Sequence, residues 1–202
     1  EARLVADLIH TNIVQTYHLG KSDNQYFMVM EYVNGVSLEQ FLEKHRELNK
    51  PIPAELAVFI IPRVARGLAY AHQKCDAQGR LLAIVHRGIG PKNIMLAGEG
   101  DVKLTDFGIA AVVDEIAEHE ATTGTPAYMA PEQYTGEGVS QRSDIYSLGL
   151  VIYELLTGKP AWRADSLAEL RTLRGGATAP PALTSTSGAD IDPALAALVD
   201  RC

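Results

Sequence analysis

Asn93 and Asp106 each have a side-chain oxygen that can bind a metal ion, and together they could hold a divalent cation. Each has a simpler interpretation alone, because asparagine and aspartate are common in turns. Asp106, however, directly follows an apolar segment expected to be a strand at 102–104 and precedes Phe107. Amide and carboxylate oxygens are the ligands that Mg²⁺ and Ca²⁺ prefer. As a pair, the two residues predict a metal site.

Four short motifs occur in order along the chain, and their elements must position that pair. They are His-Arg-Gly-Ile-Gly-Pro-Lys-Asn at 86–93, Asp-Phe-Gly at 106–108, Gly-Thr-Pro-Ala-Tyr-Met-Ala-Pro-Glu at 124–132 and Ser-Asp-Ile-Tyr-Ser-Leu-Gly at 143–149. At these intervals they resemble the catalytic loop, the metal-binding element, the end of the activation segment and the buried central helix of the protein kinase family. The resemblance implies that Asp144, in the last motif, anchors the backbone of the catalytic loop. The resemblance covers essentially the whole chain. It is to bacterial, eukaryotic-like serine/threonine kinases, and the third motif argues against a tyrosine kinase.

The resemblance implies a catalytic loop that lacks its two reacting side chains. In the family the loop reads His-Arg-Asp-x-x-x-x-Asn, and the Asp is the general base for the substrate hydroxyl. Gly88 stands at this general-base position, and Gly90 stands where a Lys would face the transferring phosphate. Asn93 and Asp106 keep the metal positions. The implied cofactors are ATP and Mg²⁺, and the implied partner is a protein substrate or a docking partner.

Two functions remain open at this point. The first is an ATP-dependent serine/threonine kinase of low efficiency, because general-base assistance is typically worth roughly 10²–10⁴-fold and its loss impairs transfer without abolishing it. The second is a pseudokinase that senses nucleotide or presents a docking surface. A sequencing error or a decayed gene would also produce the glycines, since Asp and Gly codons differ by one base. Changes at both reacting positions favour genuine divergence.

Residues 26–33 resemble the strand and hinge that receive adenine in kinases. The resemblance makes Met30 the gatekeeper and assigns the hydrogen bonds with the base to the backbones of Glu31 and Val33. It also places Met95 in contact with the base. Met30, Val33 and Met95 could equally be ordinary core residues.

The ends of the chain indicate a segment of a longer polypeptide. Glu1 lies nine residues before His10 and matches the helix Glu that pairs with a strand-three Lys in bacterial kinases. We therefore expect the Gly-rich loop and this Lys, if they exist, upstream of residue 1. At the other end, 195–202 resembles the penultimate helix of the family, and the Arg that pairs with the Ala-Pro-Glu carboxylate would follow Cys202.

Two residues of the catalytic loop have structural or regulatory interpretations. His86 is expected to pack beneath Phe107, with Val5 nearby, as part of an internal apolar spine. Arg87 could bind a phosphate on Thr122 or Thr123, or it could be a solvated surface residue. Ala111 weakens the phosphate interpretation, because the family often has a basic residue there.

Composition excludes several classes of function. The chain has 202 residues with an apolar fraction of 47%, and its net charge of −7 comes from 25 acidic against 18 basic residues. This charge argues against a nucleic-acid or anionic-membrane surface. The two cysteines, Cys75 and Cys202, fit no metal spacing and favour a reducing, cytoplasmic location. The longest apolar stretches are too short to span a membrane.

The predicted fold is α+β and resembles the bilobal kinase fold, with the N-lobe truncated before the helix-C Glu and a mostly helical C-lobe. Residues 1–34 would be the remainder of the N-lobe and the hinge, and 35–202 an incomplete C-lobe. The expected elements are strands at 13–19, 26–33 and 84–85, a helix from Ser37 through Lys44, a helix from Pro53 to about Gln73, a turn at 76–79, a hairpin at 96–104 and helices from 143 onward. Pro62 should kink the second helix, unless that helix begins later.

Overall fold

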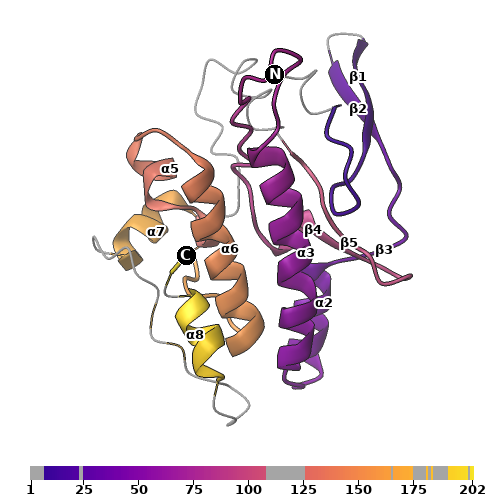
Figure 1. Ribbon diagram of the computed structural model, residues 1–202. Coiled ribbons are helices and arrows are strands. Elements are labelled where there is room, and N and C mark those ends of the chain that lie inside the picture. Colours follow the sequence, from indigo (N-terminus) through magenta and orange to yellow (C-terminus); the bar gives the residue numbers. More distant parts are fainter. Residues whose placement is uncertain are drawn as a thin grey trace.

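The computed structural model describes residues 7–22, 25–107, 126–164, 166–174, 181, 183, 191–199 and 201–202 (Figure 1). The elements, in chain order, are β1 (Thr16–Ser22), β2 (Gln25–Met30), β3 (Gly35–Ser37), α2 (Leu38–Glu47), α3 (Ala54–His72), the 3-10 turn η1 (Pro91–Asn93), β4 (Ile94–Ala97), β5 (Val102–Leu104), η2 (Pro126–Tyr128), α5 (Pro131–Thr135), α6 (Gln141–Thr157), α7 (Leu167–Arg174) and α8 (Pro193–Val199). Small sheets accompany a mainly helical remainder, so the predicted α+β class is confirmed.

The strands form two small antiparallel sheets. β1 pairs with β2 as a hairpin, and β3, β4 and β5 form a three-stranded sheet in that order. The segment before β1 is fastened to β5, because Val14 N donates to Leu104 O at 2.7 Å and Leu104 N donates to Asn12 O at 2.9 Å. The hairpin predicted at 96–104 is confirmed as the β4–β5 pair.

Helices α3 and α6 run side by side through the helical part (Figure 1). Their facing apolar side chains form the centre of the core: Val64 and Leu68 of α3 and Val151 and Leu155 of α6 are at most 1% exposed. Gly67 of α3 allows a close approach, because a Cβ there would lie 2.9 Å from the carbonyl oxygen of Asn12. The core therefore joins the helices to the segment that precedes the first sheet.

Residue types at the helix ends explain where the helices begin and end. Ser37, at the predicted start of the helix, caps α2, since its side chain accepts from Gln40 N and the Gln40 side chain accepts from Ser37 N. Ser140 caps α6 by accepting from Arg142 N, and Gly158 ends α6 in the left-handed conformation at φ 72°. The Ser140 cap fixes the first turn of α6, which carries Asp144.

The helix predicted from Pro53 to about Gln73 is confirmed as α3, which continues through Pro62. Other local predictions need correction. The helix expected to end at Lys44 continues to Glu47, and the strands expected at 13–19 and 26–33 are Thr16–Ser22 and Gln25–Met30.

The strand predicted at 84–85 is wrong, because these residues pair with no strand of the described chain. The apolar character of this pair instead reflects burial of Ile84 in the core. The predicted turn at 76–79 is flanked by an isolated bridge between Cys75 and Leu81.

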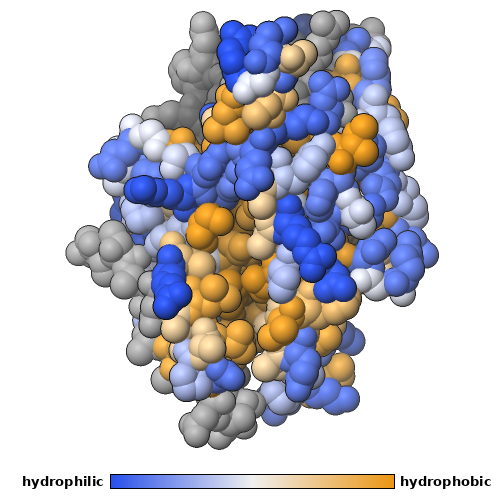
Figure 2. Space-filling model, viewed as in Figure 1, coloured by the Kyte–Doolittle hydropathy of each residue, from blue (hydrophilic) through white to orange (hydrophobic). Residues whose placement is uncertain are grey.

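Apolar side chains also reach the surface. On the face drawn in Figure 2 they gather in the lower half of the view, where Figure 1 shows α3, α6 and α8. In the part of the chain that the structure describes, none of the helices has both the length and the apolar character needed to cross a bilayer.

Candidate active site

The buried carboxylate of Asp144 holds the loop at 86–93 in place. Asp144 is 1% exposed. It accepts hydrogen bonds from the backbone N–H groups of His86 at 2.8 Å and Arg87 at 2.9 Å, and its Oδ2 lies 2.8 Å from His72 Nε2. Arg87 has φ 67°, in the left-handed region that is costly for a residue with a Cβ. The first turn of α6 thus stabilises an unfavourable conformation in the loop.

His86 links this loop to the segment around Asp106. It is 1% exposed, and its ring packs against Phe107 with 4.4 Å between the ring centroids, as expected from the sequence. Burial lowers the pKa of His86, so the imidazole is neutral. In this form Nε2 donates to Thr105 O at 2.9 Å and Nδ1 accepts from Gly88 N at 3.2 Å. His86 therefore has a structural role in the position of Gly88.

The two predicted metal-binding residues are brought together by the backbone. Asn93 ends η1, and its carbonyl oxygen accepts from Thr105 N at 3.0 Å, which places the next residue, Asp106, beside it. The Asn93 side chain donates from Nδ2 to Gly88 O at 2.8 Å, so its Oδ1 faces away from that carbonyl. Asp106 has φ 63° and accepts from the Thr105 hydroxyl at 3.3 Å. One amide oxygen and one carboxylate suit Mg²⁺, which binds few protein ligands beside phosphate oxygens.

The backbone at Gly88 and Gly90 does not require glycine. A Cβ at Gly88 would meet no atom closer than Asn93 Nδ2 at 3.5 Å, and a Cβ at Gly90 would meet none closer than Tyr128 Cδ2 at 3.4 Å. Gly90 is extended, with φ −176° and ψ 167°, a conformation open to any residue. The loop therefore accepts a Cβ at both positions, and the two glycines leave it without the functional groups that side chains there would supply.

The predicted hinge is fixed by an ion pair that the motifs did not reveal. Lys103 Nζ of β5 lies 2.6 Å from Glu31 Oε1. Partial burial opposes ionisation of Glu31, but the hydrogen bonds from Lys103 and from the Gln15 N–H, together with the Lys103 charge, outweigh this effect and lower the pKa of Glu31. The N–H of Glu31 donates to Gln15 O at 2.8 Å, so only its carbonyl is left for a ligand. Met95 pairs with Lys103 in the β4–β5 register, which places Met95 close to the hinge.

The comparisons with known proteins decide the family. The family model described as "Protein kinase domain" matches residues 1–202. The chain belongs to the protein kinase family. Bacterial relatives include the tyrosine-protein kinase MasK of Myxococcus xanthus, 38% identical over 184 residues, which are 90% of this chain and 28% of MasK. The serine/threonine-protein kinase PrkC of Bacillus subtilis is 37% identical over 172 residues, 84% of this chain and 25% of PrkC.

A further relative, the serine/threonine-protein kinase PknL of Mycobacterium tuberculosis, is 36% identical over 190 residues, 93% of this chain and 45% of PknL. The chain spans about a quarter of the length of MasK and of PrkC. This kinase domain has small sheets in the N-lobe and a helical C-lobe, and its relatives include several bacterial serine/threonine-protein kinases.

Sequence reasoning missed a buried polar network beside the kinase catalytic loop. The Tyr128 hydroxyl donates to Glu154 Oε2, and Arg46 Nη2 lies 3.3 Å from Glu154 Oε1. Glu154 is 1% exposed, and burial raises its pKa. Since the Tyr128 ring packs over Gly90, the network connects α2 and α6 to the loop. The available signal was a glutamate within the apolar run of α6.

The remaining predicted residues divide into two groups. Met30 and Val33 are half-buried beside the hinge, and their contacts with a nucleotide stay a prediction. The others lie outside the described residues, namely Glu1, Val5, Gly108, Ala111, Thr122, Thr123 and residues 124–125 of the third motif. The end of the activation segment is nevertheless tied to the catalytic loop, because Gln133 Nε2 donates to Arg87 O at 2.8 Å.

Proposed function

We propose that this kinase domain binds ATP with Mg²⁺ in the parent protein and transfers phosphate to serine or threonine of a protein substrate with impaired efficiency. The proposal rests on one observation: the catalytic loop keeps its buried supports but has glycine at both reacting positions. Asp144 and His86 hold the loop, and Asn93 and Asp106 are adjacent, while Gly88 and Gly90 offer no functional group.

Each residue has a distinct part in this proposal. The Glu31 carbonyl and the Val33 backbone hydrogen-bond to the adenine, against which Met30 and Met95 pack. Asn93 Oδ1 and the Asp106 carboxylate hold Mg²⁺, and Thr105 orients Asp106 by donating to its Oδ1. When bound, ATP supplies the phosphoryl group and Mg²⁺ neutralises its charge.

The expected loss in the rate of phosphate transfer follows from the base and the cation that Gly88 and Gly90 do not supply. A general base typically contributes roughly 10²–10⁴-fold, so the absence of a carboxylate at Gly88 lowers the rate by about that factor. Gly90 supplies no cation for the charge that develops on the transferring phosphate. Phosphoryl transfer also depends on positioning and metal charge, which Asn93 and Asp106 retain, so slow transfer persists.

A second function is favoured by the same two glycines. In a pseudokinase, the buried contacts of Asp144 and His86 would serve stability alone, and the domain would sense nucleotide or bind a protein partner. We also infer a cytoplasmic location, because Cys75 and Cys202 are free thiols and ATP is a cytoplasmic substrate.

ATP titration of the full-length protein, with and without Mg²⁺, tests the nucleotide site. We expect Mg²⁺-dependent affinity that Asp106→Asn weakens, because an amide lacks the negative charge that attracts the cation. Asp101→Asn, at an exposed position of the β4–β5 hairpin, is the matched control and should leave affinity unchanged. Binding that is independent of metal and unaffected by Asp106→Asn would contradict the site.

A further inference from the structure

Glu31, in the predicted hinge, is held through three of its polar groups. Its N–H donates to Gln15 O at 2.8 Å, and its Oε2 accepts from Gln15 N at 3.2 Å. Its Oε1 accepts from Lys103 Nζ at 2.6 Å. The side chains of Lys103 and Glu31 are 15% and 27% exposed, so solvent screens their attraction less than in a surface pair. The orientation of the Glu31 backbone is therefore determined by these neighbours.

Lys103 reaches the hinge because of its position in β5. Its two neighbours in the strand, Val102 and Leu104, are at most 1% exposed and belong to the core. Successive side chains of a strand point to opposite faces. Lys103 therefore lies on the other face of β5, where Met95 is its partner in the β4–β5 register. A predicted adenine contact and the cation that binds Glu31 thus share one face of this sheet.

Strand β5 joins the hinge to the predicted metal site. Asp106 follows Lys103 by three residues. The segment at 12–14 is also fastened to β5 by backbone hydrogen bonds, and Gln15, the next residue, holds Glu31. The hinge and Asp106 are therefore parts of one hydrogen-bonded unit. Within it, the Lys103 ammonium group links the hinge to β5 directly.

We propose that Lys103 is a positioning residue for the base: by holding Glu31, it directs the Glu31 carbonyl at the amino group of adenine. The inference rests on the proposed nucleotide binding and adds the source of its base selectivity. Adenine presents an N–H donor at its amino group, whereas guanine presents an oxygen acceptor at the same ring position. A fixed carbonyl therefore favours ATP over GTP, since two acceptors that face each other both stay unpaired. Lys103 acts through Glu31, without contact with the nucleotide.

ATP and GTP titrations of the full-length protein, both with Mg²⁺, test this role. Lys103→Met keeps an extended side chain and removes its charge. Without the ammonium group, the backbone at Glu31 must be ordered on binding, which costs about five- to thirtyfold in affinity for each residue ordered. We expect the lower end for ATP, about fivefold, because the two hydrogen bonds with Gln15 remain. GTP gains nothing from the fixed carbonyl, so its affinity should stay unchanged and the ATP-to-GTP affinity ratio should fall.

Glu31→Gln gives a second test that keeps the shape of the side chain and the acceptor for the Gln15 N–H. It should lower the ATP-to-GTP ratio as Lys103→Met does. The combination of both should lower the ratio no further, because they remove the same contact, and additive losses would overturn the pairing. Lys44→Met is the matched control. It removes an ammonium group that lies 2.9 Å from Glu47 Oε2 on the exposed side of α2, and it should leave both affinities unchanged.

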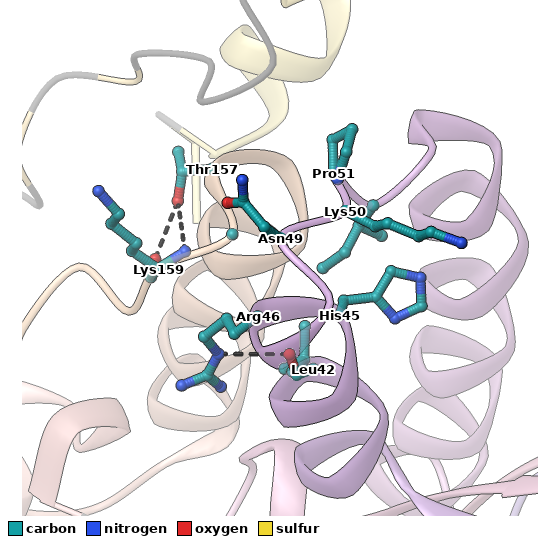
Figure 3. A pocket seen from close by; sticks show the side chains of 10 residues that line it. Leu42, His45, Arg46, Asn49, Lys50, Pro51, Thr157 and Lys159 are labelled. Carbon is teal, nitrogen blue, oxygen red and sulfur yellow. Dashed lines mark hydrogen bonds between the residues drawn. The ribbon is translucent and has the colours of Figure 1, made fainter.

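A second control concerns another place where a nucleotide could bind. A cavity of about 490 Å³ lies where the C-terminal ends of α2 and α6 meet, and Lys159 is one of its lining residues (Figure 3). Lys159→Met should leave ATP binding unchanged; a loss there, with Lys103→Met unaffected, would place the nucleotide in this cavity and overturn the proposal. A ratio that Lys103→Met does not change would overturn the role of Lys103 alone. Absence of ATP binding by the native protein would overturn the proposed function and this role together.

Discussion

Asp144→Asn should destabilise the domain, because the substitution keeps the shape of the side chain but removes its charge. The carboxylate accepts three hydrogen bonds, from His86 N and His72 Nε2 at Oδ2 and from Arg87 N at Oδ1. An amide oxygen placed at the Oδ2 site keeps the first two. The amide nitrogen then faces the Arg87 N–H, which loses its acceptor.

The expected cost follows from these contacts. Loss of one hydrogen bond to a charged acceptor costs about 1.5–3 kcal/mol, and the two that remain weaken because their acceptor is neutral. The left-handed backbone of Arg87 costs about 1–2 kcal/mol, and the substitution removes a hydrogen bond that holds Arg87 in this conformation. We therefore expect the free energy of unfolding to fall by about 3 kcal/mol. At about 2–4 °C per kcal/mol for a chain of this size, the Tm should fall by about 6–12 °C.

Urea unfolding followed by fluorescence of Trp162, the single tryptophan of the chain, measures this change. An unchanged m-value would show that stability, not the compactness of either state, is altered. Asp101→Asn is the matched control on an exposed turn and should stay within about 0.5 kcal/mol of the native protein. If Asp144→Asn were as stable as this control, Asp144 would not be the support of the catalytic loop.

Two further predictions concern His86 and Gly67. The pKa of His86 is lower in the folded than in the unfolded chain. The stability that neutral His86 contributes is therefore fully present above the unfolded pKa of about 6.5, and it is lost as the pH falls toward the folded pKa. The loss is at most about 1.4 kcal/mol per pH unit. Urea midpoints at pH 7.5 and 5.5 should show this loss in the native protein and less of it in His86→Gln; parallel curves would contradict it. Gly67→Ala should destabilise by about 1–3 kcal/mol, because its Cβ would meet the Asn12 carbonyl oxygen at 2.9 Å, whereas Gly138→Ala, with no atom within 4 Å, should be neutral by the same assay.

The sequence predicted those parts of the fold that depend on local residue types. Ser37 indicated the start of α2 because capping is a contact between residues three apart. The order of the four motifs placed Asn93 near Asp106, and in the structure Asn93 O accepts a hydrogen bond from the N–H of Thr105, the residue before Asp106. Asp144 was predicted as the support of the catalytic loop from its motif, and its hydrogen bonds agree.

Contacts between distant parts of the chain were not predictable from single residues. Lys103 and Glu31 are 72 residues apart, and Arg46 and Glu154 are 108 apart, so neither pair leaves a local pattern. The error at 84–85 has a related cause. A short apolar pair satisfies the composition of a strand, but only tertiary packing decides whether it joins a sheet or is buried as irregular chain.

Phosphate transfer by the full-length protein tests the central claim most directly. Native protein should transfer labelled phosphate from ATP to a protein substrate slowly, with Asp106→Ala defining the background. Gly88→Asp combined with Gly90→Lys should raise the rate by at least about 10²-fold, because a Cβ fits at both positions and the new side chains restore the base and the cation. Gly90→Lys alone should help less, since the substrate hydroxyl would stay unoriented. Native activity equal to that of the double variant, and abolished by Asp106→Ala, would contradict the account and show an active kinase.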